Sequence, residues 1–69
     1  MAERLANSLK ERRTELSLTQ AELADRVGVT RKTVNTVENG VFTPSTILAL
    51  KLAEALDRRV EELFRLTED

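Results

Sequence analysis

The feature that most constrains the fold is a pair of short amphipathic segments, residues 20–27 and 30–38. In each segment the apolar residues recur at the spacing of one helical face, as Val34 and Val37 do in the second. Gly28 lies in the short turn between them, where a chain leaving a helix often adopts a positive φ, which glycine does without a Cβ clash. The second helix is therefore expected to pack through a narrow apolar stripe and to leave its other face exposed.

The boundaries of both segments carry local signals. Thr19 and Glu22 form a capping box, in which the threonine hydroxyl and the glutamate carboxylate each accept a hydrogen bond from a backbone N–H of the first turn. Thr30 is the expected N-cap of the second segment, and Asn39-Gly40 ends it. Two short helices joined by a turn of about three residues containing glycine have the layout of a helix-turn-helix.

Helical periodicity extends through most of the remaining sequence. Ser45 is the expected N-cap of a helix that is apolar on much of its circumference and is therefore expected to be buried. Residues 65–69 have two interpretations, a short strand or a frayed end. With one proline, two glycines and no repeat, residues 1–69 are expected to form a single domain. The predicted helices cover about residues 6–16 (marked by Leu5, Leu9 and Leu16), 20–27, 30–38, 46–56 and 60–64.

The composition argues against several classes of protein. The chain has no cysteine, histidine or tyrosine, so we expect no disulfide, no metal site, no cofactor and no enzyme activity. No apolar run approaches the ~20 residues that a membrane span needs, and the N-terminal residues lack a signal-peptide core. We expect a cytoplasmic protein that binds no membrane and no small-molecule ligand.

The net charge of −1 conceals an uneven distribution of charge. Residues 1–25 carry −1 and residues 52–69 carry −3, whereas residues 26–51 carry +3 because Glu38 is the only acid among them. Whole-chain arithmetic therefore hides a basic middle segment. Arg31 and Lys32 lie at the N-terminus of the second short helix, where the helix dipole disfavours cations. That placement favours a binding role, although both side chains have the alternative of being solvated surface residues.

The run LTQAELADRVGVTRKTVNTVENG resembles the helix-turn-helix of the phage-repressor-like family (Cro/C1, or xenobiotic-response-element type) of DNA-binding proteins. The following TPSTILALKLAEALDRRVEELF resembles the fourth and fifth helices of that family, and the resemblance covers roughly residues 7–64. It implies an all-α, five-helix lambda-repressor-like domain, possibly with a short terminal β-hairpin. It also implies a sequence-specific transcriptional regulator, more often a repressor, of the compact bacterial kind.

The resemblance implies that the second short helix docks in the major groove of double-stranded DNA. Arg31 and Lys32 match the main base-reading positions and Thr36 a third, and Arg31 can pair with O6 and N7 of guanine. Gln20 matches a position that contacts a phosphate or a base, with capping of its own helix as the alternative. Asn39 is equally consistent with a phosphate contact and with an ordinary helix terminator. The expected DNA-binding residues are Gln20, Thr30, Arg31, Lys32, Thr33, Asn35, Thr36, Asn39 and Thr43.

Two arginines of the first helix receive structural assignments. Relatives pair the residues that match Arg13 and Glu38, so we expect a partly buried ion pair there. Arg12 stands where relatives often have an apolar residue, and its stem packs on the core or its head contacts a phosphate.

The resemblance also implies a homodimer that reads a palindrome with half-sites about one helical turn (~34 Å) apart. One rival function is an antitoxin or a restriction-modification controller, which shares the fold. Another is a protein-interaction module that has lost DNA binding. For Leu63 and Phe64 the alternative is that they complete the core. The expected interface residues are Leu5, Val60, Leu63, Phe64 and Leu66.

Overall fold

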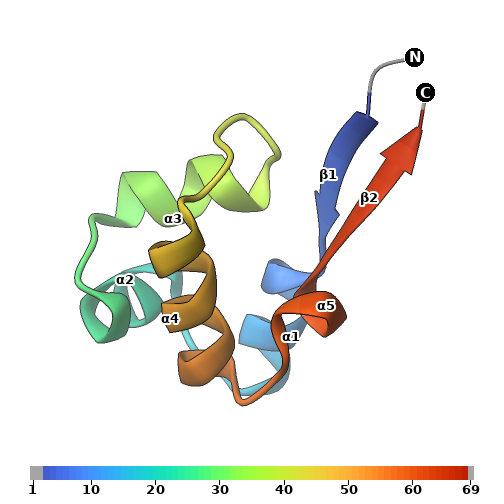
Figure 1. Ribbon diagram of the computed structural model, residues 1–69. Helices are drawn as coiled ribbons and strands as arrows, with labels where there is room; N and C mark the ends of the chain where they lie inside the picture. Colours follow the sequence, from blue (N-terminus) through green and yellow to red (C-terminus); the bar gives the residue numbers. More distant parts are fainter. Residues whose placement is uncertain (1–2, 69) are drawn as a thin grey trace.

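The computed structural model describes residues 3–68, which form five helices and a two-stranded antiparallel sheet (Figure 1). The helices form one body, and the two strands project from it side by side, so that both ends of the described chain lie together. No helix within this range is long and apolar enough to cross a membrane. In chain order the elements are β1 (Glu3–Asn7), α1 (Leu9–Glu15), α2 (Gln20–Val27), α3 (Arg31–Glu38), α4 (Thr46–Leu56), α5 (Val60–Leu63) and β2 (Phe64–Glu68).

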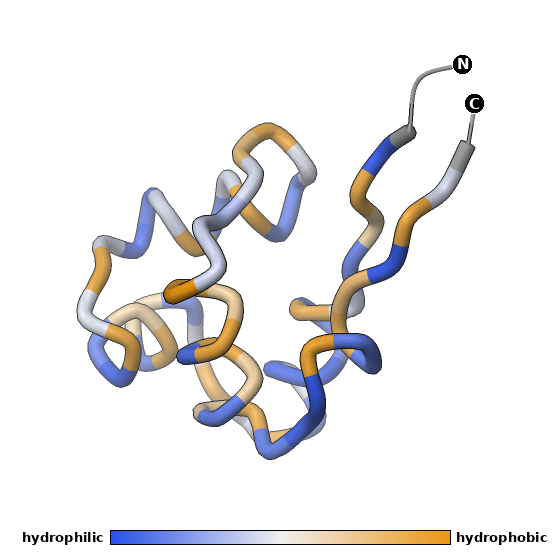
Figure 2. The backbone as a smooth tube through the Cα atoms, in the orientation of Figure 1, coloured by the Kyte–Doolittle hydropathy of each residue, from blue (hydrophilic) through white to orange (hydrophobic). Residues whose placement is uncertain are grey.

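The five-helix prediction with a terminal hairpin is confirmed, but the predicted start of the first helix is wrong. Residues 6 and 7 belong to β1, and α1 begins at Leu9. β1 pairs with β2 in a register that places Leu5 opposite Leu66, and both strands alternate between hydrophobic and hydrophilic residues (Figure 2). The spacing of Leu5 and Leu9 fits one helical face equally well, so only the partner strand distinguishes the two structures. Of the two interpretations of residues 65–69, the strand is confirmed as far as Glu68, and Asp69 lies outside the described residues.

The caps of the helix-turn-helix form as predicted. The Thr19 hydroxyl accepts a hydrogen bond from the backbone N–H of Glu22 at 3.0 Å, and Glu22 Oε1 accepts one from the backbone N–H of Thr19 at 2.9 Å. The bond from the Thr19 backbone, together with that from its side chain, holds the pKa of Glu22 below its ordinary value. Gly28 ends α2 with φ +76°, a left-handed conformation that favours glycine, and Thr30 accepts from the backbone N–H of Thr33 at 3.2 Å.

The core lies where α1, α2, α3, α4 and α5 meet. Two predictions about it are wrong. Leu16 is 37% exposed at the end of α1, and Leu18, two residues later, is buried instead. α4 is not buried on all sides either, because Ile47 is 68% and Leu50 57% exposed. The buried residues are Leu9, Leu18, Leu23, Ala24, Val27, Val34, Val37, Leu48, Leu52, Ala53, Leu56, Leu63 and Phe64.

The position of Arg12 agrees with packing rather than with a phosphate contact. Its side chain is 15% exposed, and Nε donates to the backbone carbonyl of Leu56 at 2.8 Å. Leu56 is the last residue of α4, where carbonyls lack a partner within the helix and a nearby cation is favourable. The guanidinium group therefore caps α4, and this explains a charged residue at a largely buried position.

Candidate nucleic-acid interface

α3 lies across one end of the helical body and presents a polar face away from α2 and α4 (Figure 1). Val34 and Val37 are each 2% exposed, as the narrow apolar stripe predicts. Arg31 and Lys32, in the first turn, are exposed and follow the N-cap Thr30. Two basic side chains therefore extend from the beginning of a short helix whose opposite face is fully packed.

Gln20 joins α2 to this face of α3. Its side-chain Nε2 donates to Asn35 Oδ1 at 3.1 Å and to Glu38 Oε1 at 3.0 Å. Its Oε1 lies 3.5 Å from Arg31 Nη1, the longest distance in this group. Because both amide hydrogens are engaged by acceptors on α3, the remaining oxygen is turned toward Arg31. Gln20 thus orients the first turn of α3, whether or not it also contacts DNA.

The predicted ion pair between Arg13 and Glu38 is present. Arg13 Nε lies 2.7 Å from Glu38 Oε2, and the two side chains are 12% and 2% exposed. Arg13 Nη2 also donates to Glu38 Oε1 at 3.3 Å, so the pair is bidentate. Nη1 of the same guanidinium donates to the backbone carbonyl of Leu18 at 2.8 Å. This pair ties α1 and the following turn to the end of α3, and Glu38 Oε1 is shared with Gln20.

The threonines and Asn35 are held by local hydrogen bonds. Thr36 Oγ1 donates to the carbonyl of Thr33 at 2.9 Å, and the hydroxyls of Thr30 and Thr33 lie 3.1 Å apart. Asn35 Oδ1 accepts from Gln20 and also from Asn39 Nδ2 at 3.3 Å. Thr33, Asn35 and Thr36 are half-buried, whereas Arg31 and Lys32 are exposed. The side chains that are most accessible on α3 are therefore the two cations of its first turn.

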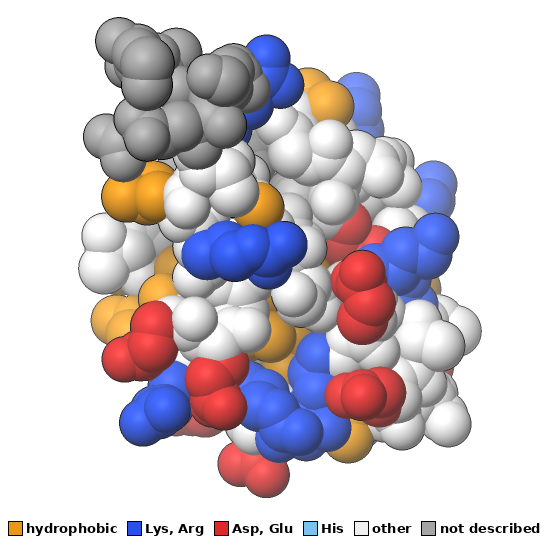
Figure 3. Space-filling view, turned by 90° about the vertical axis from the view of Figure 1, so that its right-hand side faces the viewer, with side chains coloured by type: hydrophobic (Ala, Val, Ile, Leu, Met, Phe, Trp, Pro, Cys, Tyr) orange, Lys and Arg blue, Asp and Glu red, His pale blue; other side chains and the backbone are white. Residues whose placement is uncertain are grey.

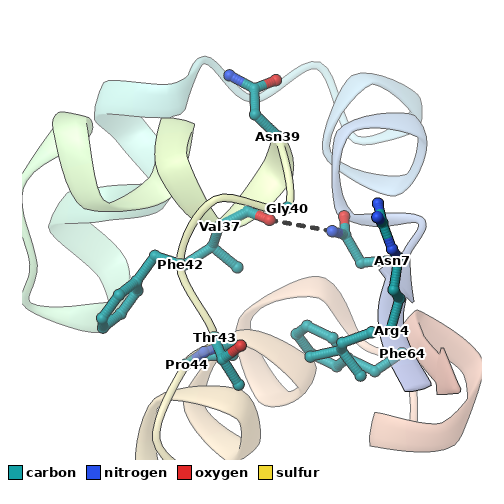
Figure 4. Close-up of a pocket in the computed structure, with 10 residues that line it drawn as sticks. Arg4, Asn7, Val37, Asn39, Gly40, Phe42, Thr43, Pro44 and Phe64 are labelled. Carbon is teal, nitrogen blue, oxygen red and sulfur yellow. Dashed lines mark hydrogen bonds between the residues drawn. The ribbon is translucent and has the colours of Figure 1, made fainter. Parts of the chain in front are cut away.

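Asn7 is a contributor that sequence analysis missed. Its Nδ2 donates to the backbone carbonyls of Val37 at 3.0 Å and Glu38 at 3.4 Å, and its Oδ1 accepts from the backbone N–H of Leu9 at 3.1 Å (Figure 4). One amide thus caps the beginning of α1 and the end of α3. The exposed residues Asn39 and Thr43 belong to the loop that follows α3.

The basic residues of the middle segment lie in two separate places. Arg31 and Lys32 are on α3, whereas Arg26 and Lys51 line a hollow beside Gly28 together with Asp25 and Glu54. Carboxylates therefore offset the second pair, and the uncompensated positive charge of this segment is concentrated on α3.

The residues expected at a dimer interface divide between core and surface. Leu63 is 2% and Phe64 8% exposed, so both pack inside the protomer, and Leu63 has almost no surface to offer a partner. Leu66 is 67% exposed, and Leu5 and Val60 are half-buried. The side of the molecule that carries the terminal strands shows apolar side chains among interspersed basic and acidic ones (Figure 3).

Comparison with known proteins identifies the family. A model described as "Helix-turn-helix" matches residues 9–63, which include α2, α3 and their flanking helices. The chain belongs to the helix-turn-helix family. An HTH-type transcriptional regulator of Methanothermobacter thermautotrophicus is 53% identical over 62 residues, covering 88% of this chain and 90% of that protein. YgzD, an HTH-type transcriptional regulator of Bacillus subtilis, is 40% identical and covers 94% of this chain and 98% of the relative.

Two solved structures resemble this helix-turn-helix protein closely. The restriction-modification controller protein C.AhdI of Aeromonas hydrophila superposes with a TM-score of 0.74 at 42% identity, covering 78% of each chain. The P22 c2 repressor, crystallised with a synthetic operator, superposes with a TM-score of 0.75 at 28% identity over 77% of this chain and 80% of the repressor chain. These comparisons confirm the resemblance to Cro/C1-type repressors, and the relatives include archaeal as well as bacterial proteins.

Proposed function

We propose that this protein regulates transcription by binding a palindromic operator as a homodimer, with α3 of each protomer in the major groove. The observation that carries the proposal is the exposure of Arg31 and Lys32 on the first turn of a helix that Gln20 and the Arg13–Glu38 pair hold from behind. HTH-type transcriptional regulators are the relatives of the chain, and the P22 c2 repressor of the same fold is seen with operator DNA.

The arrangement divides the work among the site residues. Arg31 reads guanine through two parallel hydrogen bonds to O6 and N7, and Lys32 contacts guanine or a neighbouring phosphate. Thr36, one turn later, makes a third base contact after its hydroxyl leaves the carbonyl of Thr33. Thr30, Thr33 and Asn35 flank these contacts.

The residues at the two ends of the motif position the protein on the DNA backbone. Gln20 contacts a phosphate or a base beside the N-terminus of α2, where free backbone N–H groups favour an anion. Asn39 and Thr43 contact phosphates from the loop after α3. Such contacts fix the register of α3 without reading sequence.

A homodimer follows from the small size of this contact surface. One protomer neutralises few phosphates, whereas a two-fold symmetric pair doubles them and reads two half-sites. Leu66, Leu5 and Val60 are the interface residues that remain accessible, and Leu5 and Leu66 are direct cross-strand neighbours. An operator that overlaps a promoter makes such a dimer a repressor.

Selection from a randomised pool of DNA duplexes at near-physiological salt, with sequencing of the bound fraction, tests the proposal. Enrichment of a palindrome with guanine in each half-site is the expected result. Binding without enrichment contradicts base reading and leaves phosphate contacts alone. Absence of binding favours a protein-interaction module of the same fold.

Arg31→Ala tests the base-reading role on the enriched duplex. We expect the substitution to weaken binding by about 1–3 kcal/mol and to relax the preference for guanine at one position of each half-site, because the bidentate contact is lost. Competition between duplexes that differ at that single position measures both effects. Arg26→Ala, on α2 and beside carboxylates, is the matched control and should keep the preference. An unaltered preference in Arg31→Ala contradicts the assignment.

The resemblance to C.AhdI favours a second candidate function, a restriction-modification controller. A controller has the same DNA chemistry but acts on the promoters of a restriction-modification system. If a gene for a restriction endonuclease lies beside the gene for this protein, and the selected palindrome occurs upstream of it, the controller is supported. A palindrome that occurs only at unrelated promoters contradicts it.

A further inference from the structure

A polar hollow adjoins α3 on the side of the terminal strands (Figure 4). It has a volume of about 380 Å³ and lies between β1 and the loop that follows α3. The buried side chains of Val37 and Phe64 supply its apolar part. Exposed Arg4 from β1 and exposed Asn39 and Thr43 from the loop supply its polar part. Residues from both ends of the described chain thus meet beside the candidate DNA-binding helix.

The charge and the hydrogen-bonding groups of this hollow suit an anion. Of the described residues that line it, Arg4 is the only charged one, and none is a carboxylate. Asn39 and Thr43 add an amide and a hydroxyl, which donate hydrogen bonds to oxygen. A guanidinium group forms two parallel hydrogen bonds with phosphate oxygens more readily than an ammonium group does. The hollow therefore combines one cation with neutral donors and holds no group that repels an anion by formal charge.

The end of α3 is prepared for a negative ligand. The last carbonyls of a helix carry partial negative charge and would oppose an anion. Here the Asn7 amide donates to the carbonyls of Val37 and Glu38, which occupies them within the protein. The loop is anchored to the same helix, since the carbonyl of Thr36 accepts from the backbone N–H of Val41 at 2.9 Å. Asn39 and Thr43 are thereby carried on a segment whose start is fixed relative to α3.

We propose that this hollow binds a phosphodiester of the DNA backbone, with Arg4 as the charged contact and Asn39 and Thr43 as hydrogen-bond donors. The proposal rests on the DNA binding proposed above and adds a contact from β1, outside the helix-turn-helix. Because the phosphate carries no sequence information, Arg4 contributes affinity and register but no base preference. The terminal strands then connect the dimer surface with the DNA surface.

The salt dependence of DNA binding tests the charged contact. Each phosphate neutralised by the protein contributes about −0.9 to the slope of log K against log salt concentration. For Arg4→Gln we expect a slope shallower by about 0.9 per protomer, so that the affinity advantage of the wild type shrinks about eightfold per protomer for each tenfold rise in salt. Arg4→Lys should keep most of the slope. Arg58→Gln makes the same charge change in the connection between α4 and α5, away from α3, and should keep the wild-type slope (Figure 1).

A scan with methylphosphonates, which neutralise one phosphate at a time in the selected duplex, locates the contact. We expect one position per half-site at which neutralisation weakens the wild type but not Arg4→Gln, with equal melting temperatures of the two proteins. Equal sensitivity of both proteins at every position overturns the proposal, as does a wild-type salt slope in Arg4→Gln. Titration with inorganic phosphate covers the other source of this anion: Arg4-dependent binding of free phosphate, without an Arg4-dependent position in the duplex, also overturns it. If the wild type binds no duplex, the proposed function fails as well, whereas DNA binding that does not depend on Arg4 refutes this inference alone.

Discussion

At the scale of single residues, Glu38 connects the stability of the fold with the orientation of the DNA-binding face. Its carboxylate accepts hydrogen bonds from Arg13 and from Gln20 while its side chain is 2% exposed. The Arg13 contact ties α1 to α3, and the Gln20 contact fixes the amide that faces Arg31. A single buried carboxylate therefore supports two helices and the first turn of the helix that meets DNA.

Glu38→Ala is expected to lower the free energy of unfolding by about 3–5 kcal/mol. The substitution leaves the Arg13 guanidinium largely buried without its counter-ion, and breaking a buried pair from one side has roughly this cost. Urea denaturation followed by circular dichroism measures the change. The loss should be evident before any loss of DNA affinity that cannot be attributed to unfolding.

Two further variants separate the buried pair from a general effect of removing a glutamate. Glu54→Ala removes an exposed carboxylate from α4 and should change the unfolding free energy by less than about 0.5 kcal/mol. Replacing both partners together (Arg13→Met with Glu38→Leu) should recover part of the loss, because no unpaired charge remains. A midpoint for Glu38→Ala equal to that of the wild type would show that the pair contributes nothing.

At the scale of elements, Asn7 is the connection among β1, α1 and α3. It ends the strand, accepts from the first backbone N–H of α1 and donates to the last carbonyls of α3. Each of these groups lacks a partner within its own helix. The amide therefore transmits the position of the terminal strands to the end of the DNA-binding helix.

Asn7→Ala is expected to lower the free energy of unfolding by roughly 1–3 kcal/mol, because it leaves a partly buried N–H and two carbonyls without their bonds. Asn7→Asp is the informative companion: its carboxylate still accepts from Leu9 but cannot donate to Val37, and it faces the negative end of α3. Amide hydrogen exchange should then accelerate in β1 and in the last turn of α3. Unchanged protection in α3 for both variants would contradict the connection.

The elements that were predicted correctly are those whose signals are local. The caps at Thr19, Thr30 and Ser45 and the left-handed Gly28 depend on neighbours within three residues, so the sequence shows them directly. β1 depends on pairing with a strand about sixty residues away, and nothing in the spacing of its own residues requires it.

The candidate site follows the same division. The exposure of Arg31 and Lys32 and the pair of Arg13 with Glu38 agree with expectation, the latter because the resemblance identified both partners. The Arg12 contact with Leu56 and the Asn7 contact with Val37 join residues 44 and 30 positions apart. Hydrogen bonds of that range depend on the packing of whole helices, which local spacing does not reveal.

At the scale of the whole molecule, the exposed apolar side chains bear on self-association. Leu66 and Ile47 are almost equally exposed, at 67% and 68%, but lie on different elements, β2 and α4. Leu66 belongs to a two-stranded sheet, whose outer edges offer unpaired backbone groups to another strand. Ile47 lines a hollow beside the helix-turn-helix. Only the first of these places lies among the residues expected to bind a second copy.

Leu66→Lys should therefore weaken the dimer about 10- to 100-fold, because it removes the burial of a leucine and places like charges near the two-fold axis. Light scattering coupled to size-exclusion chromatography measures the oligomeric state over a range of protein concentrations. Ile47→Lys introduces the same charge at equal exposure and should leave the dimer unchanged. If Leu66→Lys stays dimeric at every concentration at which the wild type does, the proposed interface is wrong.

The pairing of β1 with β2 also has a consequence for the order of folding. The register from Glu3–Glu68 to Asn7–Phe64 closes a loop of nearly the whole described chain, and such a closure is entropically unfavourable until many contacts compensate it. Helical contacts are local and form within about a microsecond, so the helices are in place before the strands meet. In the proposed dimer, a second copy then meets its binding surface only on a chain that has finished folding. Association of incomplete chains, a common origin of aggregation, is disfavoured by this sequence of events.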